Sequence, residues 1–210
     1  MVFELEKMLG AALAGGRSSR MGSDKAIVEL AGRTLVQGAV EKLEENFSEV
    51  VVVSTQRWAR LPADVEIVPD LKPGLGPLGG IASALARGEG RAVFILACDL
   101  PFVPSELIQL LIETKKAASS DSPHLAVVPR WQGEVEPLCG VYNSEILPTV
   151  KRALAEGTYG VQELLRTVPV KVVEVAASLS FAHPNIFMNL NRPEDLQRAS
   201  ELVTKRRESR

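Results

Sequence analysis

The sequence predicts an α/β fold in which helices cover both faces of a mostly parallel sheet. Short apolar runs alternate along the chain with longer stretches that space apolar residues by three or four, as helices lying on a sheet do. Two of the short runs, 50–53 and 93–97, are apolar at every position, which is typical of strands buried on both faces. Together these patterns indicate a layered domain with the sheet in the middle.

The elements follow one another in a regular order. The first half of the chain predicts a strand at 7–13, a helix at 35–46, strands at 49–54 and 65–68, a helix at 79–87 and a strand at 91–98. The second half predicts a helix at 104–116, a strand at 125–128, a helix at 144–156, strands at 170–175 and 186–189, and a helix at 193–203. The segment 118–123 has the composition of a loop. We expect one domain over residues 1–204 and a short basic tail at 205–210.

Composition excludes several classes of function. Among 210 residues, 24 are Lys or Arg and 26 are Asp or Glu, so the net charge of −2 does not predict a nucleic-acid partner. No apolar stretch is long enough to span a membrane, and the start of the chain lacks the pattern of a secretion signal. The only cysteines, Cys98 and Cys139, are predicted to be buried free thiols. These features favour a cytoplasmic protein.

The loop after the first strand combines glycines with basic residues. Its sequence, Leu-Ala-Gly-Gly-Arg-Ser-Ser-Arg-Met-Gly-Ser-Asp-Lys, runs from Leu13 to Lys25. Glycines let backbone N–H groups approach phosphates, and the cations can offset phosphate charge. A mobile surface loop with solvated charges is the alternative, but the loop directly follows an apolar strand, where ligands reach such sheets. The spacing is not that of a Walker A loop.

A second glycine-rich loop spans residues 70–80 and contains Gly-x-Gly-x-x-Gly at positions 74, 76 and 79. Asp99 lies twenty residues past Gly79, so a dinucleotide-binding site is an alternative interpretation. In that fingerprint the first glycine comes immediately after the strand, whereas residues 70–73 intervene here. We therefore favour another kind of nucleotide loop.

Asp99 ends a predicted strand that is otherwise apolar. A carboxylate in such a place is costly to desolvate unless a cation meets it. Mg²⁺ is the natural cation, because it takes oxygen ligands and bridges carboxylates to nucleotide phosphates. A helix cap or a strand-end turn is the alternative, and the neighbouring glycine loop favours the metal.

Asn189 and Asn191 alternate in a segment, predicted to be extended, that leads into the helix starting at Pro193. Two amide side chains on one face can bind a polar ligand, so we expect both to lie near the metal or a ligand phosphate. Capping of the helix by Asn191 is the alternative.

The first loop resembles the signature Leu-Ala-Gly-Gly-x-x-x-Arg-Met-Gly-x-Asp-Lys of the molybdenum cofactor guanylyltransferases. This resemblance implies a three-layer Rossmann-like nucleotidyltransferase fold with a mostly parallel central sheet. It also implies a transfer of GMP from GTP to molybdopterin, with release of pyrophosphate and with Mg²⁺ as cofactor. Gly76-Pro77-Leu78-Gly79-Gly80 is similar to the family loop that contacts the base, and Asp-x-Pro at Asp99 to the family metal motif.

The resemblance assigns roles to individual residues. It implies catalytic roles for Arg20, Lys25 and Asp99, with the metal on Asp99, and acceptor binding, near the metal or the pterin phosphate, by Asn189 and Asn191. The implied nucleotide-binding residues are Leu13, Ala14, Gly15, Gly16, Lys25, Asp70, Gly76, Pro77, Leu78, Gly79 and Asp99. Segments 136–142 and 157–165 resemble the acceptor side of the family cleft, but we assign no catalytic role to Glu136 or Tyr142.

One departure from the family concerns the start of the last helix. The family has a threonine where this chain has Arg192, and loss of such a cap costs about 1 kcal/mol. Glu194 and Asp195 in the first turn offset part of that cost.

Other activities remain open at this point. The same chemistry with CTP or with a different phosphate acceptor is the nearest alternative. The Gly-Gly pair that ends at Gly16 favours guanine, because relatives that use CTP usually have Leu-Ala-Ala-Gly here. A non-catalytic nucleotide-binding subunit and an NAD-dependent enzyme are further alternatives. The resemblance implies exchange of substrate and product with molybdenum-insertion proteins and molybdoenzyme chaperones.

Overall fold

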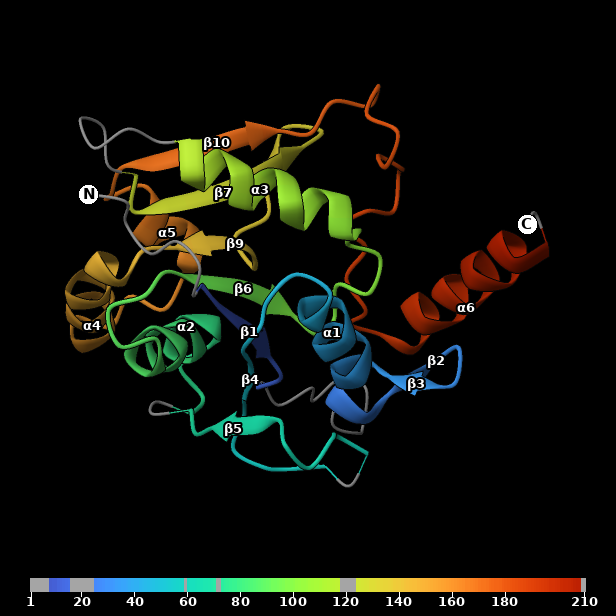
Figure 1. Cartoon of the computed structure of the whole chain (residues 1–210), viewed down its shortest axis with the longest axis horizontal. Coiled ribbons are helices and arrows are strands. Elements are labelled where there is room, and N and C mark those ends of the chain that lie inside the picture. Colours follow the sequence, from blue (N-terminus) through green and yellow to red (C-terminus); the bar gives the residue numbers. More distant parts are fainter. Residues whose placement is uncertain (1–7, 16–24, 59, 71–72, 118–123, 209–210) are drawn as a thin grey trace.

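The computed structural model describes residues 8–15, 25–58, 60–70, 73–117 and 124–208. An eight-stranded sheet forms the centre, in the order β10-β7-β9-β6-β1-β4-β5, and β8 pairs with β7 (Figure 1). The strands are β1 (Leu9–Leu13), β4 (Val50–Val53), β5 (Glu66–Val68), β6 (Val93–Ala97), β7 (Ala126–Trp131), β8 (Glu134–Val135), β9 (Cys139–Tyr142) and β10 (Val170–Glu174). Only the pairings of β9 and β8 are antiparallel within this sheet. The predicted mostly parallel sheet is thus confirmed.

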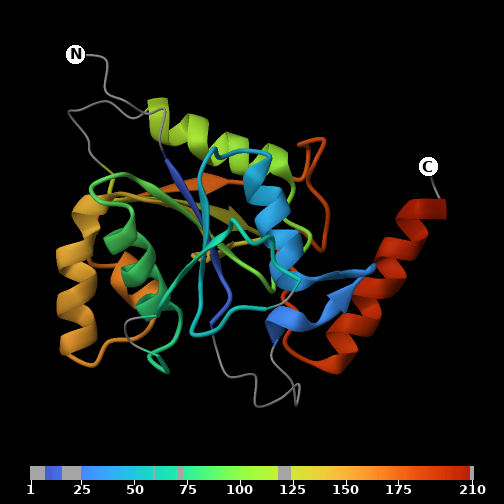
Figure 2. The ribbon, with the colours of Figure 1, turned by 60° about the horizontal axis from the view of Figure 1, so that its bottom comes forward.

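Helices cover both faces of the sheet and make the three layers (Figure 2). The helices are α1 (Leu35–Glu44), α2 (Pro77–Arg87), α3 (Ser105–Ala117), α4 (Leu147–Ala155), α5 (Val161–Leu165) and α6 (Pro193–Glu208), with short 3₁₀ helices η2 (Lys25–Ile27) and η3 (Ser144–Ile146). Helices α1 and α3 contribute to one buried apolar cluster, and α2, α4 and α5 to the other.

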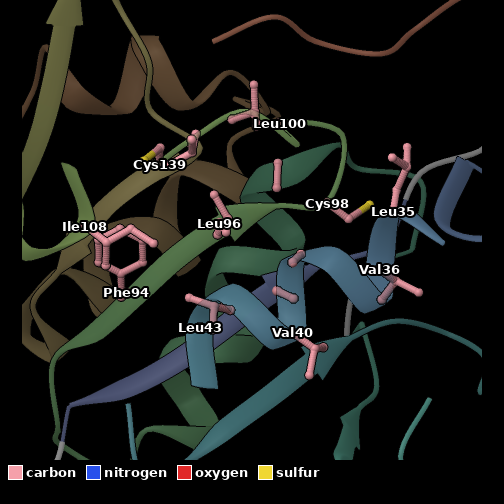
Figure 3. Packing of buried hydrophobic residues seen from close by; sticks show 14 of the residues in the cluster. Leu35, Val36, Val40, Leu43, Phe94, Leu96, Cys98, Leu100, Ile108 and Cys139 are labelled. Atoms are coloured by element: carbon pink, nitrogen blue, oxygen red, sulfur yellow. The ribbon is translucent and has the colours of Figure 1, made fainter. Parts of the chain in front are cut away.

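Strand β6 explains why some predicted strands are apolar throughout. Phe94 and Leu96 belong to the cluster on the α1 and α3 side, part of which is shown in Figure 3. Val93 and Ile95 belong to the cluster on the α2, α4 and α5 side. Because successive strand residues point to opposite faces, a strand between two helical layers needs apolar residues at every position. The two cysteines are buried and free, as predicted.

Helix α6 packs beside a small hairpin at the edge of the molecule. The hairpin consists of β2 (Glu29–Leu30) and β3 (Arg33–Thr34), and both views place α6 against it (Figures 1 and 2). The predicted helix is therefore present, but it continues from Val203 to Glu208. That extension runs into the segment 205–210 that we expected to be a basic tail.

The prediction of a strand at 186–189 is wrong. The backbone N–H of Ile186 donates to the carbonyl of His183 at 3.0 Å, and that of Met188 donates to Asn185 at 3.0 Å. These local bonds close successive turns, so the segment pairs with no strand of the described sheet.

Strand β9 is missing from the predicted strands, as are the hairpin β2–β3 and helix α5. A Cβ atom on Gly140 of β9 would lie 2.7 Å from the Val127 carbonyl oxygen of β7. This position therefore needs glycine because the two backbones approach closely, a requirement that side-chain periodicity does not reveal.

Candidate active site

The candidate site lies at the carboxyl edge of the sheet, where the strand order reverses. Strand β1 pairs with β4 on one side and with β6 on the other. The Cys98 N–H donates to the Leu13 carbonyl at 3.1 Å, so the loop after β1 and the turn after β6 begin next to each other. In open α/β sheets, ligands bind in the crevice beside such a reversal. The topology thus brings the start of the first glycine-rich loop and the turn that contains Asp99 to one place.

One wall of the site joins the ends of β1 and β5. Gly15 is exposed, and a Cβ on it would lie 3.8 Å from Oδ2 of Asp70. Leu13 and Ala14, each 7% exposed, precede it in the core. The glycine therefore leaves an open approach to the backbone, bounded on one side by a carboxylate. The structure brings Gly15 and Asp70 together, as their predicted common role in nucleotide binding requires.

Helix α2 begins beside this wall. Gly76 is its N-cap residue with φ at +70°, a conformation that favours glycine, and Pro77 occupies the first turn. A Cβ on Gly80 would lie 3.3 Å from Leu13 Cδ2, which shows how closely the helix start approaches β1. The unsatisfied N–H groups and the positive end of the helix dipole suit an anion or a polar base edge.

Leu78 and Gly79 have a narrower role than their prediction as nucleotide-binding residues suggests. The Leu78 side chain is fully buried in the core under α2, and Gly79 is buried as well. Gly76 and Pro77 are exposed. Consequently Leu78 can contribute only its backbone to a ligand.

The other wall of the site contains Asp99, in the turn that follows β6. Its Oδ1 atom is buried, and its backbone carbonyl accepts a hydrogen bond from the Leu190 N–H at 3.0 Å. Leu190 is fully buried, so it anchors the neighbouring residues at this wall. Because Asn189 precedes Leu190, this bond brings Asn189 close to Asp99, although Asn189 and Asp99 are ninety positions apart in the chain.

Helix α6, which follows Leu190, is capped by a residue of its own first turn. Oδ2 of Asp195 accepts hydrogen bonds from the backbone N–H groups of Asn191, at 3.0 Å, and Arg192, at 2.9 Å. A carboxylate near a helix N-terminus satisfies free N–H groups and complements the helix dipole. Asp195 thus supplies the compensation that we expected for the missing threonine.

A second carboxylate lies near Asp99, and sequence reasoning gave it no role. Burial raises the pKa of Glu136, and the charge of Asp99 raises it further, against a hydrogen bond from the Leu138 N–H that lowers it. Glu136 precedes β9, which is antiparallel to β6, so the start of β9 meets the end of β6. A local motif could not reveal this neighbour because the pairing joins segments forty residues apart.

The donor groups at this wall fit a magnesium ion. Oδ1 of Asn189 is buried and has no hydrogen-bond partner within the described ranges, so it is an available neutral oxygen ligand. Among those residues no group of three or more His, Cys, Asp or Glu side chains is arranged to hold a metal. Few protein ligands are what Mg²⁺ requires, because it keeps several waters and shares substrate phosphates.

Some of the predicted residues lie outside the description. Gly16 and Arg20 fall in the undescribed segment 16–24, and for Lys25 only the backbone, which begins η2, is described. Their predicted contacts with phosphate remain predictions. Within the described part of the chain, no helix is both long and apolar enough to cross a membrane.

The acceptor-side segment 157–165 lies next to the second glycine loop. A Cβ on Gly76 would lie 3.8 Å from the carbonyl oxygen of Tyr159, whose side chain is 43% exposed. Tyr142, by contrast, is fully buried, and its hydroxyl donates to the Pro137 carbonyl at 2.6 Å. The Tyr142 side chain is therefore part of the core.

Comparison with known proteins identifies the family. The model of the MobA-like NTP transferase domain matches residues 10–196. The chain is 32% identical over 204 residues to a probable molybdenum cofactor guanylyltransferase of Thermococcus kodakarensis, covering 94% of this chain and 96% of that protein. It is 34% identical over 194 residues to one of Methanothermobacter thermautotrophicus, covering 89% and 96%.

Solved structures agree with this assignment. The crystal structure of molybdopterin-guanine dinucleotide biosynthesis protein A from Archaeoglobus fulgidus has a TM-score of 0.78 and 29% identity, over 94% of this chain and all of that one. The fold also occurs in 2-C-methyl-D-erythritol 4-phosphate cytidylyltransferase from Thermus thermophilus, with a TM-score of 0.67 and 20% identity over 94% and 99% of the chains. The chain belongs to the family of MobA-like NTP transferase domains.

Proposed function

We propose that this chain is a molybdenum cofactor guanylyltransferase, which transfers GMP from GTP to molybdopterin and releases pyrophosphate. One observation carries the proposal: the described ends of the glycine loops, at Gly15 and at the start of α2, lie with the Asp99 turn at the reversal of strand order, and the bond from Leu190 holds the neighbouring Asn189 close to Asp99. The names of the relatives agree with this chemistry.

The chain's own residues bind and orient the nucleotide. Gly15 gives the nucleotide close access to the backbone. The first turn of α2, which Pro77 opens after the N-cap Gly76, offers backbone N–H groups such as that of Leu78 to the base. We expect Arg20 and Lys25 to hold the triphosphate and to stabilise the charge that develops on it. Phosphoryl-type transfer depends mainly on such positioning and charge neutralisation.

Asp99 and the amide oxygen of Asn189 are the groups that would hold Mg²⁺. When bound, the ion neutralises phosphate charge during the transfer. Asp99 is fixed for this task by the backbone bond from Leu190 and by the pairing of β6 with β1.

The proposed reaction needs no general base. An oxygen of the terminal phosphate of molybdopterin attacks the α-phosphorus of GTP and forms a new P–O bond. The bond from that phosphorus to the oxygen bridging the β-phosphate breaks, and pyrophosphate leaves with the bonding electrons. Because a phosphate monoester is already largely ionised near neutral pH, no proton has to be removed from the attacking group.

We propose a cytoplasmic location, since both buried cysteines are free thiols, as in a reducing compartment. Delivery of molybdopterin by molybdenum-insertion proteins, and removal of the product by molybdoenzyme chaperones, would follow from the same function.

Thermal unfolding with Mg²⁺ and GTP, CTP, ATP or NAD tests the nucleotide. A ligand at a hundred times its Kd adds about 2.7 kcal/mol to the free energy of unfolding, so we expect a clear rise in Tm with GTP. A rise confined to CTP or NAD would contradict the guanine assignment.

Pyrophosphate release from GTP and molybdopterin tests the catalytic role of Asp99. We expect Asp99→Ala to abolish the release while the variant stays folded. Asp64→Ala, at an exposed position in the segment before β5, is the matched control and should retain full activity. Undiminished release by Asp99→Ala in the presence of Mg²⁺ would remove Asp99 from the site.

A further inference from the structure

Glu136 is a carboxylate that the topology places at the proposed metal site. It lies in the connection between β8 and β9, just before β9 pairs antiparallel with β6 in the central sheet. Since β9 runs opposite to β6, its first residues lie at the edge where β6 ends. Glu136 therefore reaches the crevice from the side opposite to the nucleotide loops.

Hydrogen bonds hold this residue in place. The Glu136 N–H donates to the Pro129 carbonyl of β7 at 3.0 Å, and its Oε1 accepts from the Leu138 N–H at 2.9 Å. The Leu138 carbonyl in turn accepts from the Ala97 N–H, at the end of β6, at 2.9 Å. Leu138 alone thus connects the carboxylate to Ala97, the last residue of β6 and two positions before Asp99.

The electrostatic surroundings of Glu136 are unfavourable for a lone carboxylate. Its side chain is partly buried, in the connection between β8 and the start of β9. Within the described residues, no Lys or Arg forms an ion pair with Glu136, and no hydrogen bond engages its Oε2. Two neighbouring carboxylates in a partly dry crevice repel each other unless a cation lies between them. The fold nevertheless keeps both of them there.

Asn189 provides the second, independent observation. Its Oδ1 is buried without a hydrogen-bond partner among the described residues, next to the residue whose N–H holds the Asp99 carbonyl. A buried carbonyl oxygen without a donor costs about 1–3 kcal/mol. A divalent cation would satisfy this oxygen and would also neutralise the two carboxylates.

We propose that Glu136 is a further ligand of the divalent cation and completes, with Asp99 and Asn189, a set of oxygen donors contributed by three distant segments. Oε1 is fixed by the Leu138 N–H, which leaves Oε2 for the ion. Hard oxygen donors of this kind suit Mg²⁺ and Mn²⁺. The inference deepens the proposed function at the same site, but binding of the metal alone can test it.

The direct measurement is the binding of Mn²⁺ to the metal-free full chain. The electron paramagnetic resonance signal of free Mn²⁺ monitors this binding, with and without a non-hydrolysable GTP analogue. Loss even of an outer partner of a metal site lowers affinity about 10–100-fold, so we expect Glu136→Gln to weaken Mn²⁺ binding at least about tenfold. Glutamine still accepts the Leu138 N–H bond, so the loop should keep its conformation.

Glu134→Gln is the matched control, because Glu134 lies two residues earlier and is exposed. Its affinity for Mn²⁺ should stay within about twofold of the unmodified chain. Without metal, we expect the Tm of Glu136→Gln to equal or exceed that of the unmodified chain, since the repulsion from Asp99 is removed. A folded variant with weakened Mn²⁺ binding is therefore the supporting result.

Unchanged Mn²⁺ affinity in Glu136→Gln would overturn the proposal. If that unchanged affinity came with a raised KM for molybdopterin, Glu136 would contact the acceptor instead of the metal. Failure of the unmodified chain to bind Mn²⁺ under either condition would overturn the metal site as a whole. Weakened binding in Glu136→Gln, combined with no pyrophosphate release by the unmodified chain, would support this inference and refute the proposed function.

Discussion

Lys42 connects helix α1 to the segment that follows Asp99, and its replacement is the sharpest test of how the site is supported. Its Nζ donates to the Pro101 carbonyl at 3.2 Å and also to the Val103 carbonyl. Val103 is fully buried. The Lys42→Met variant keeps most of the apolar stem and removes the ammonium group, so both carbonyls lose a charged donor.

The size of the effect follows from these contacts. A hydrogen bond to a charged group contributes about 1.5–3 kcal/mol, and removing two of them would cost about twice that amount. The methionine recovers part of the cost, because no charge then has to be partly desolvated. We expect a net loss of about 1.5–3 kcal/mol in the free energy of unfolding, or about 3–12 °C in Tm for a chain of this size.

Urea unfolding followed by the fluorescence of the two tryptophans measures this loss. Lys116→Met is the matched control, because Lys116 forms an exposed ion pair with Glu113 at 2.9 Å and should change stability by less than about 0.5 kcal/mol. A Lys42→Met variant that matched this control would show that the two carbonyl contacts add nothing to stability, which would refute the expected loss.

Three further substitutions test the packing of β9 against β7 and an ion pair at the amino ends of β4 and β6. Gly140→Ala should cost about 1–3 kcal/mol, because its Cβ would lie 2.7 Å from a backbone oxygen of β7, whereas Gly38→Ala, in open space within α1, should stabilise the chain by about 0.5–1 kcal/mol. Equal stabilities of the two variants in urea would contradict this assignment. The hydrogen bond from Arg91 lowers the pKa of Glu49 below its ordinary value of 4.5. The pair therefore stabilises the fold fully above pH 4.5, the pKa in the unfolded chain, and this contribution is lost as the pH falls through the lower pKa of the folded chain. Glu49→Gln should therefore cost about 0.2–1 kcal/mol at pH 7, as partly exposed pairs do, and nothing near pH 2; a cost that did not change with pH would refute it.

Local patterns in the sequence determined much of this protein. The apolar runs of β1, β4 and β6 predict buried parallel strands, because a strand between two helical layers must be apolar on both faces. Glycines and charges directly after such strands predict where a ligand binds, since that edge of the sheet is open. Asp99 was singled out in this way, from its place at the end of an apolar strand, whereas Asp70 was singled out by the family resemblance.

Only the tertiary structure decided which distant residues join the site. The bond from Leu190 to Asp99 and the antiparallel entry of β9 bring Asn189 and Glu136 to the same crevice. The alternation of Asn189 and Asn191 predicted a ligand for Asn189, but no local pattern pointed to Glu136. Side-chain periodicity reports which face of an element is buried and not which strand becomes its neighbour. The strand predicted at 186–189 was wrong for the same reason. Its apolar residues indicate burial, but the segment forms local turns and pairs with no strand of the described sheet.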